Sequence, residues 1–354
     1  MPTKRTELHT IGEFGLIARI RTLVDFHVDD ATLHENLVRG VADDAAVYRP
    51  TPGKVQIFTT DAMVEGVHFD LTFQSVKHLG WKAMVCNISD VAAMGGVPRY
   101  AAVVLSLPQK MSVEMVEEFY EGAVFACKKY SCLIVGGDTT ASSGNMMVTV
   151  AMTGEADGAK VVYRSGAEPG DLICVTGHLG AAHAGLSILL REKERFVKAP
   201  DPEAFEPNLE PYKFALKRYL MPEPRLDMSR LLVDNVKIHA MIDVSDGAAS
   251  EVRHVCESSN VGAEVWEHNL PVEGVTQLIA RELSKSATEL ALYGGEEYEL
   301  LFTLSDKEFA KLERLTNDVT VIGRIVDLQR GVELVRESGE RQPLPVGGWD
   351  HFRK

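Results

Sequence analysis

Short apolar runs typical of β-strands alternate with helical patterns along most of the chain. Strands are predicted at residues 54–60, 99–107, 132–135, 146–153, 171–176, 239–243, 298–304 and 319–325. Helices are predicted at residues 11–26, 76–87, 112–129, 180–191 and 248–258. Strands interleaved with helices in this way predict an α/β (α+β) fold.

Two domains are predicted from the length of the chain and from one turn-rich segment. A chain of 354 residues is long enough for two domains or one large one. The segment 154–158 begins and ends with glycine, and we place a domain boundary there. The prediction is an N-terminal domain over 1–155 and a C-terminal domain over 156–354, with the proline-rich segment 192–211 as an exposed excursion.

The charge balance and the cysteines exclude several classes of protein. Lys and Arg number 37 against 51 Asp and Glu, a net charge of −14, which repels nucleic acid and anionic membranes. The five cysteines contain no CxxC pair, so neither a disulfide framework nor a zinc site is predicted. No apolar run approaches the ~18 residues of a membrane span, and residues 1–9 do not resemble a secretory signal. We expect a cytoplasmic protein.

Several aspartates lie beside predicted strands or small residues in segments without Lys or Arg. Asp61 follows one predicted strand, Asp138 another, and Asp243 and Asp246 a third. Asp43, Asp44 and Asp90 are likewise expected to lack a nearby base. A lone buried carboxylate costs several kcal/mol unless a positive group compensates it, and Mg²⁺ is one such group. The alternative is that these acids cap helices, as Ser245 or Asp246 could before residues 248–258.

A group of Mg²⁺ ions would imply a phosphate-rich ligand, because the ions invert the local sign in an acidic protein. The common nucleotide motifs are nevertheless missing from the sequence. It contains no GxxxxGK[ST] and no HRD or DFG set, and residues 177–180 (GHLG) are not a GxGxxG motif. An ATP-dependent enzyme with this sequence is therefore not of the P-loop, protein-kinase or Rossmann type.

Nine segments, in order and spanning nearly the whole chain, resemble the thiamine-monophosphate kinase family. These segments are residues 12–17, 43–46, 59–69, 87–98, 136–140, 164–171, 243–247, 294–300 and 347–352. The family belongs to a superfamily with aminoimidazole ribonucleotide synthetase, selenophosphate synthetase and a hydrogenase-maturation protein. Two positions depart from the family pattern: Ala42 stands where Gly is usual, and Glu297 stands where Asp is usual.

The resemblance implies a fold, a reaction and a set of site residues. The fold is a two-domain aminoimidazole ribonucleotide synthetase-like architecture, each domain a mixed sheet packed with helices, in a homodimer. The reaction converts ATP and thiamine monophosphate into ADP and thiamine diphosphate and requires several Mg²⁺ ions. The implied metal ligands are Asp44, Thr59, Thr60, Asp61, Asp90, Asp138, Asp243 and Asp246. The implied ATP contacts are Tyr120, Gly137, Asp138, Arg164 and Ser245, and the implied thiamine-phosphate contacts are His68, Glu296 and Trp349.

The implied chemistry needs no protein base or nucleophile. A phosphomonoester has a second pKa of about 6, so the attacking oxygen is already anionic near neutral pH. We therefore expect direct in-line transfer of the γ-phosphoryl group without a phosphoenzyme. Three alternatives remain at the level of sequence: another ATP-dependent enzyme of the superfamily, such as aminoimidazole ribonucleotide synthetase, a metal-dependent phosphohydrolase, and a noncatalytic module that binds Mg-nucleotide.

Overall fold

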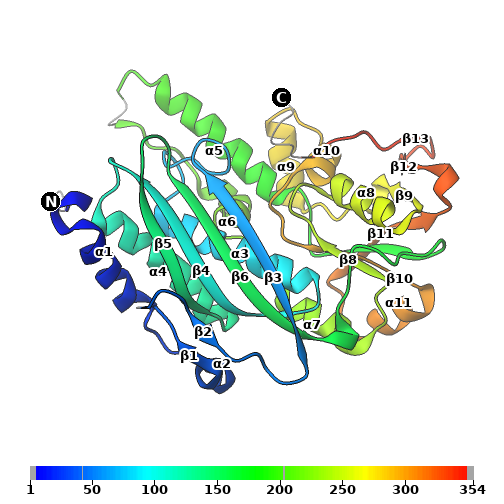
Figure 1. Ribbon diagram of the computed structural model, residues 1–354. Helices are drawn as coiled ribbons and strands as arrows, with labels where there is room; N and C mark the ends of the chain where they lie inside the picture. Colours follow the sequence, from blue (N-terminus) through cyan, green and yellow to red (C-terminus); the bar gives the residue numbers. More distant parts are fainter. Residues whose placement is uncertain (1–4, 42, 202–203, 349–354) are drawn as a thin grey trace. The chain divides into compact units, whose positions relative to one another are not determined.

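The computed structural model describes residues 5–41, 43–201 and 204–348, and the chain forms two compact units (Figure 1). Unit 1 comprises Met1–Val91 and Gly96–Ala159. Unit 2 comprises Ala92–Gly95 and Lys160–Lys354. Within the described residues, no helix is both long enough and apolar enough to span a membrane.

Unit 1 is built on a four-stranded mixed sheet with the order β3-β6-β4-β5. Its strands are β3 (Lys54–Val64), β4 (Val97–Pro108), β5 (Leu133–Ser142) and β6 (Met147–Asp157). Strand β6 pairs antiparallel with β3 and β4, whereas β4 and β5 run parallel. The other elements are α1 (Leu8–Val24), α2 (Ala31–Asn36), β1 (Leu37–Arg39), β2 (Val47–Tyr48), α3 (Val76–Ala93) and α4 (Val113–Tyr130).

One face of this sheet is covered by helices, and much of the other is exposed. In Figure 1, α3 and α4 lie behind the strands. Along β4, Val103 and Leu105 are fully buried while Val104 between them is exposed, as the alternation of a strand requires. Phe58 on β3 and Met147 on β6 are also exposed.

The two covering helices approach each other at glycines. A Cβ atom on Gly80 of α3 would lie 1.9 Å from the carbonyl oxygen of Phe119, and one on Gly122 of α4 would lie 1.9 Å from that of Lys77. Because both contacts are with backbone atoms, neither neighbour can rotate away. The two glycines therefore set the distance between α3 and α4, and with it the position of the side chains that α3 holds against the sheet.

Substitution of Gly122 tests this packing. We expect Gly122→Ala to lower the free energy of unfolding by about 2 kcal/mol, because the added methyl group forces the helices apart. Gly144→Ala is the matched control, since a Cβ atom there meets nothing within 4 Å. Chemical denaturation of the three proteins measures the difference, and equal stabilities of the two variants would show that the helices tolerate the added methyl group.

Unit 2 contains a seven-stranded mixed sheet with the order β13-β12-β9-β11-β7-β10-β8. Its strands are β7 (Leu172–Thr176), β8 (Ala240–Asp243), β9 (Gly262–Trp266), β10 (Leu300–Leu304), β11 (Val319–Val326), β12 (Val332–Val335) and β13 (Arg341–Pro343). Its helices are α5 (Ala181–Val197), α6 (Lys213–Leu220), α7 (Leu226–Asn235), α8 (Ala248–Ser259), α9 (Gly274–Glu282), α10 (Ala287–Tyr293) and α11 (Asp306–Leu312). Among the described strands of this sheet, only β12 and β9 pair in parallel.

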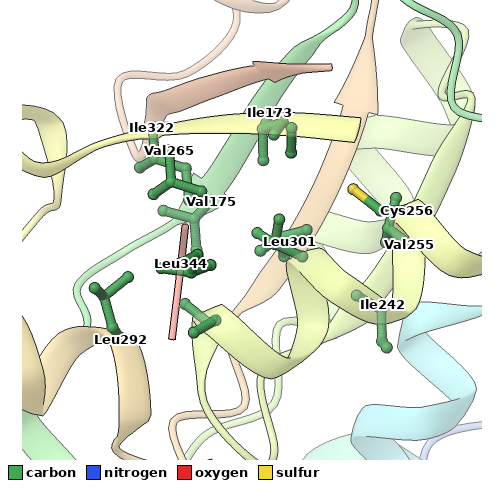
Figure 2. Close-up of a cluster of buried hydrophobic side chains, with 14 of the residues drawn as sticks. Ile173, Val175, Ile242, Val255, Cys256, Val265, Leu292, Leu301, Ile322 and Leu344 are labelled. Atoms are coloured by element: carbon green, nitrogen blue, oxygen red, sulfur yellow. The ribbon is translucent and has the colours of Figure 1, made fainter. Parts of the chain in front are cut away.

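Both faces of the unit 2 sheet are buried. Leu301 of β10 belongs to a core that also contains residues of α8 and α10, such as Val255 and Leu292 (Figure 2). Its neighbour Phe302 points to the opposite core, where α7 supplies Leu232 and α11 supplies Leu312. The sheet is thus the middle layer of three. Each unit is a mixed sheet packed with helices, as the sequence predicts.

Several elements differ from the sequence predictions, and three of them illustrate why. Strand β3 continues to Val64 and β5 to Ser142, so Asp61 and Asp138 lie inside strands and not after them. The reason is pairing: β6 and β4 offer ladder partners along the full length, and this outweighs the low strand propensity of Asp and Gly. Helix α5 continues to Val197, so the first part of the predicted excursion is helical.

Candidate functional site

In unit 1, β3 and α3 bring Thr59, Asp61 and Asp90 to the helix-covered side of the sheet. The Thr59 hydroxyl donates a hydrogen bond to Oδ2 of Asp90 at 2.5 Å. Asp61 follows two residues later on the same strand, and the register places it in a row with the buried Val150 and Val103. Residues two apart on a strand share a face. The three residues therefore present hydroxyl and carboxylate oxygens in one region.

Asp138 belongs to a different part of unit 1. The register pairs it with the exposed Val104, on the face opposite to Asp61. Its strand β5 is also three positions from β3 in the sheet, about 14 Å at ~4.8 Å per strand. Ligands of one Mg²⁺ ion must each lie about 2.1 Å from it. Asp61 and Asp138 of one chain therefore cannot share an ion, so these two aspartates do not meet at one point within unit 1.

Thr60 lies on the exposed side, and its hydroxyl donates to the carbonyl oxygen of Val150 at 3.0 Å. Asp44 is exposed, and its backbone N–H donates to Oδ1 of Asp43 at 3.1 Å. Asp43 has a base nearby after all, because Nε of Arg39 lies 3.3 Å from its Oδ2. The expectation that no base is near this pair is therefore wrong. Ala42 lies outside the described residues.

The remaining predicted residues of unit 1 differ in accessibility. His68 is held against the end of β3, because the backbone N–H of Val64 donates to its Nδ1 at 3.0 Å. Gly137 lies where a Cβ atom would come within 2.0 Å of the carbonyl oxygen of Val103, so a side chain does not fit there. Tyr120 is 3% exposed, packs edge-on against Phe119, and has its pKa raised by burial. This burial argues against direct contact between Tyr120 and a nucleotide.

In unit 2, the end of β8 carries the second group of predicted residues. Asp243 ends the strand and is 3% exposed, and Ser245 and Asp246 follow in the turn before α8. The turn closes at Gly247, whose φ of 118° is unfavourable for other residues and whose Cβ position lies 2.9 Å from the carbonyl oxygen of Leu292. A strand end, a tight turn and a helix start thus fix the three side chains.

Glu251 is a residue of this site that the sequence analysis missed. It is 2% exposed, and its Oε1 accepts a hydrogen bond from the backbone N–H of Asp246 at 3.0 Å. Burial, together with the negative charges of Asp243 and Asp246, raises the pKa of Glu251 to about 8, against the opposing effect of Arg164. The available signal was its position in the same base-free segment, 238–252, as the two aspartates.

The segment 294–299 lies directly beside this turn. The backbone N–H of Glu296 donates to the carbonyl oxygen of Ser245 at 2.7 Å, which brings a predicted substrate contact next to a predicted ATP contact. Gly348 also packs here, since a Cβ atom on it would lie 2.8 Å from the carbonyl oxygen of Asp246. Arg164 is exposed. Trp349, which follows Gly348, lies outside the described residues.

The predicted ligands fit an Mg²⁺ ion that is bound partly by the protein and partly by phosphate oxygens of a substrate. Among the described residues, no group of three His, Cys, Asp or Glu side chains is close enough to hold a metal ion. Mg²⁺ commonly takes only one or two carboxylates and completes its shell with water and phosphate oxygens. That mode suits the oxygens of Thr59 and Asp90 in unit 1 and of Asp243 and Asp246 in unit 2. The described residues contain no set of side chains that could enclose a metal ion by themselves.

Comparison with known proteins gives one consistent family. The model of the AIR synthase related protein N-terminal domain matches residues 42–156, and that of the C-terminal domain matches residues 168–336. Thiamine-monophosphate kinase of Bacillus subtilis is 35% identical over 91% of this chain and 96% of that protein. The same enzyme of Aquifex aeolicus is 34% identical over 98% of this chain and 99% of that protein.

Solved structures agree with this result. A structure described as AaThiL complexed with AMPPCP and TMP is 32% identical, with a TM-score of 0.72 over 99% of this chain and 100% of that chain. Thiamine-monophosphate kinase of Stenotrophomonas maltophilia is 32% identical, with a TM-score of 0.75 over 93% of this chain and 97% of that chain. The hydrogenase maturation protein HypE, 19% identical with a TM-score of 0.71, shares the fold. The family resemblance and the two-domain fold are confirmed.

The raised pKa of Glu251 gives a prediction about stability. Because the folded protein holds this proton up to about pH 8 and the unfolded chain releases it near pH 4.5, Glu251 should destabilise the fold increasingly as the pH rises through that range. Glu251→Gln should remove this loss, so the variant gains stability over the wild type between about pH 5 and pH 8. Denaturant unfolding at several pH values, with a chelator present, measures the gain. Glu257→Gln, exposed on the same helix, should show none.

Proposed function

The chain belongs to the thiamine-monophosphate kinase family of AIR synthase related proteins, and we propose that it phosphorylates thiamine monophosphate with ATP, giving thiamine diphosphate and ADP. The observation that carries the proposal is near-complete coverage by relatives of that name at 34–35% identity. The neighbour in complex with AMPPCP and TMP supports both substrates. The site supports it too, because Ser245 and Glu296, one proposed for each substrate, are joined by a backbone hydrogen bond.

The residues proposed to hold Mg²⁺ are divided between the two units. Asp44, Thr59, Thr60, Asp61, Asp90 and Asp138 belong to unit 1, and Asp243 and Asp246 belong to unit 2. When bound, Mg²⁺ would neutralise phosphate charge and so reduce the repulsion between the two substrates. Thr59 bonds the Asp90 carboxylate through its 2.5 Å hydrogen bond, and the N–H of Asp246 is held by Glu251. Both contacts orient oxygen donors before any ion arrives.

The chain's own groups would bind and orient the substrates. We propose that Gly137, Asp138, Arg164 and Ser245 contact ATP. His68, Glu296 and Trp349 are proposed to contact thiamine monophosphate. Tyr120 is left out of the set because it is buried.

No protein base is required, because the acceptor phosphate is largely ionised near neutral pH. The geometry of His68 agrees with a binding role: its Nδ1 already accepts a hydrogen bond from Val64 and is therefore not free to take a proton from the substrate. We propose direct transfer of the γ-phosphoryl group between the two substrates, with positioning and charge neutralisation as the main sources of acceleration. A phosphorylated side chain recovered during turnover would contradict this mechanism.

The homodimer is a further part of the proposal. Its support, beyond the family resemblance, is the uncovered face of the unit 1 sheet, where the register places the exposed side chains of Phe58, Val104 and Met147 on one side of the sheet. Large apolar side chains gathered on one uncovered face are typical of protein interfaces. The cytoplasmic location stays a prediction.

The activity is tested by incubating the pure protein with ATP, Mg²⁺ and thiamine monophosphate and separating the products by chromatography. We expect thiamine diphosphate and ADP in equal amounts. ADP or phosphate without thiamine diphosphate would instead support another superfamily enzyme or a phosphohydrolase, and tight ATP binding without turnover would support a binding module.

Asp243→Asn tests the proposed metal ligand. We expect kcat/KM to fall by roughly 100-fold and the Mg²⁺ concentration for half-maximal rate to rise, because a neutral amide binds the ion more weakly. Asp171→Asn is the matched control: Asp171 is also buried but lies at the opposite end of the strands of the same sheet. A similar loss of activity in both variants would assign the effect of Asp243→Asn to folding.

A further inference from the structure

Two residues of the segment 294–299 have a backbone conformation that side chains disfavour. Glu296 has a φ of 65° and Tyr298 a φ of 54°, both in the left-handed region, and neither is Asn, Asp or Gly. Such conformations persist only where the surroundings hold them, and they are concentrated at functional sites. The structure therefore has to supply contacts that fix this stretch of backbone.

The contacts come from the buried side of the segment, where the side chains of Glu297 and Glu299 lie. Glu297 and Glu299 have fully buried side chains, and Arg218 of α6 reaches both. Its Nη2 lies 2.6 Å from Oε1 of Glu299 and 3.5 Å from Oε2 of Glu297. The same nitrogen donates to the backbone carbonyl oxygen of Glu297 at 3.2 Å. Arg218 thus holds the peptide between the two strained residues directly.

A second arginine completes the support of Glu299. Arg225 binds its carboxylate with two nitrogens, Nε to Oε2 and Nη2 to Oε1, the latter at 2.9 Å. The hydroxyl of Thr176 donates to Oε2 of Glu299 at 2.6 Å. Gly177 leaves room for this pair, because a Cβ atom there would lie 2.0 Å from Nη2 of Arg225. Bidentate arginine bonds fix geometry as well as charge.

The strained segment is bound on its other side to the turn that follows β8. The N–H of Glu296 donates to the carbonyl oxygen of Ser245, and that of Tyr298 donates to Val244 at 2.9 Å. The N–H of Val244 donates in return to the carbonyl oxygen of Glu299 at 2.7 Å. If the segment moves, the Glu296 backbone therefore moves with it, and the hydrogen bond to Ser245 transmits the movement to the turn.

We propose that Arg218 is a positioning residue for the phosphate acceptor, acting through the backbone at Glu297 to place the Glu296 side chain where it meets the substrate. This inference deepens the proposed function and depends on it for the identity of the substrate. Arg218 touches neither substrate. It holds the peptide that carries the contact, and the side chains of Glu297 and Glu299 hold Arg218.

Arg218→Lys is the variant that tests this role. Lysine keeps the charge, but its side chain is shorter and lacks the planar guanidinium, so its ammonium group does not reach the position from which Nη2 bonds both carboxylates and the carbonyl oxygen. We expect the KM for thiamine monophosphate to rise by about tenfold or more, since small displacements of positioning groups are costly. The KM for ATP should change by less than about threefold. The control is His239→Gln, which breaks the part-buried His239–Asp171 pair at 2.8 Å at the opposite end of the strands; it should leave both KM values unchanged.

A double-mutant cycle with Glu296→Gln separates positioning from general damage. If Arg218 acts through Glu296, the double variant should have nearly the same KM for thiamine monophosphate as Glu296→Gln alone. Independent effects that multiply, or equal rises in both KM values after Arg218→Lys, would overturn the proposal.

Hydrogen exchange gives a readout that does not depend on the reaction. Amide exchange of peptides covering 294–300 should accelerate in Arg218→Lys without substrate, because the N–H groups of Glu296 and Tyr298 lose their fixed acceptors, and it should not accelerate in His239→Gln. If the wild-type protein has no kinase activity but the two variants show this exchange pattern, the proposed function is refuted and the positioning of the backbone by Arg218 remains supported. Unchanged exchange would refute the positioning role. If Arg218→Lys does not fold, Glu297→Gln, which keeps the size of the side chain, must show the same KM selectivity and exchange pattern.

Discussion

In unit 2, buried carboxylates and the groups that compensate their burial determine how the predicted site residues at the end of β8 and in segment 294–299 are arranged. Glu299 is fully buried and is stabilised by two arginines and the Thr176 hydroxyl. Glu251 is also buried, but within the part of the chain that the structure describes no arginine bonds to it: it accepts one backbone N–H, and burial raises its pKa to about 8. The difference is physical. Burial in an apolar setting favours the protonated form of Glu251, whereas two arginines and a hydroxyl surround the Glu299 carboxylate.

Unit 1 differs from unit 2 because helices cover only one face of its sheet. The covered face places Thr59 against Asp90 of α3, and the glycine contact between α3 and α4 fixes where that helix lies. The uncovered face carries Asp138 and exposed apolar side chains. The proposed metal ligands of unit 1 therefore lie on both faces of the same sheet. For this reason they do not form one cluster within a chain.

Local patterns in the sequence predict the elements and the acidic segments, but not their partners. The alternation of strands and helices, and the placement of Asp243 at a strand end, follow from local periodicity. The sequence predicts that the strands end before Asp61 and Asp138, whereas pairing partners that are distant in sequence extend β3 and β5 past them. For the same reason Arg218 and Arg225 were not identified. Each lies more than seventy residues from Glu299, and only the fold brings them together.

The departure of Glu297 from the family's usual Asp has a structural explanation in the start of α5. That helix begins after Gly180, which has no side chain to cap it. Oε1 of Glu297 accepts the N–H of Ala182 at 2.9 Å, while Oε2 faces Arg218. A carboxylate at a helix N-terminus is stabilised by the exposed N–H groups there. The longer side chain of Glu thus reaches a donor on α5 and an arginine on α6 at once, so one residue joins two helices to the strained peptide that presents Glu296.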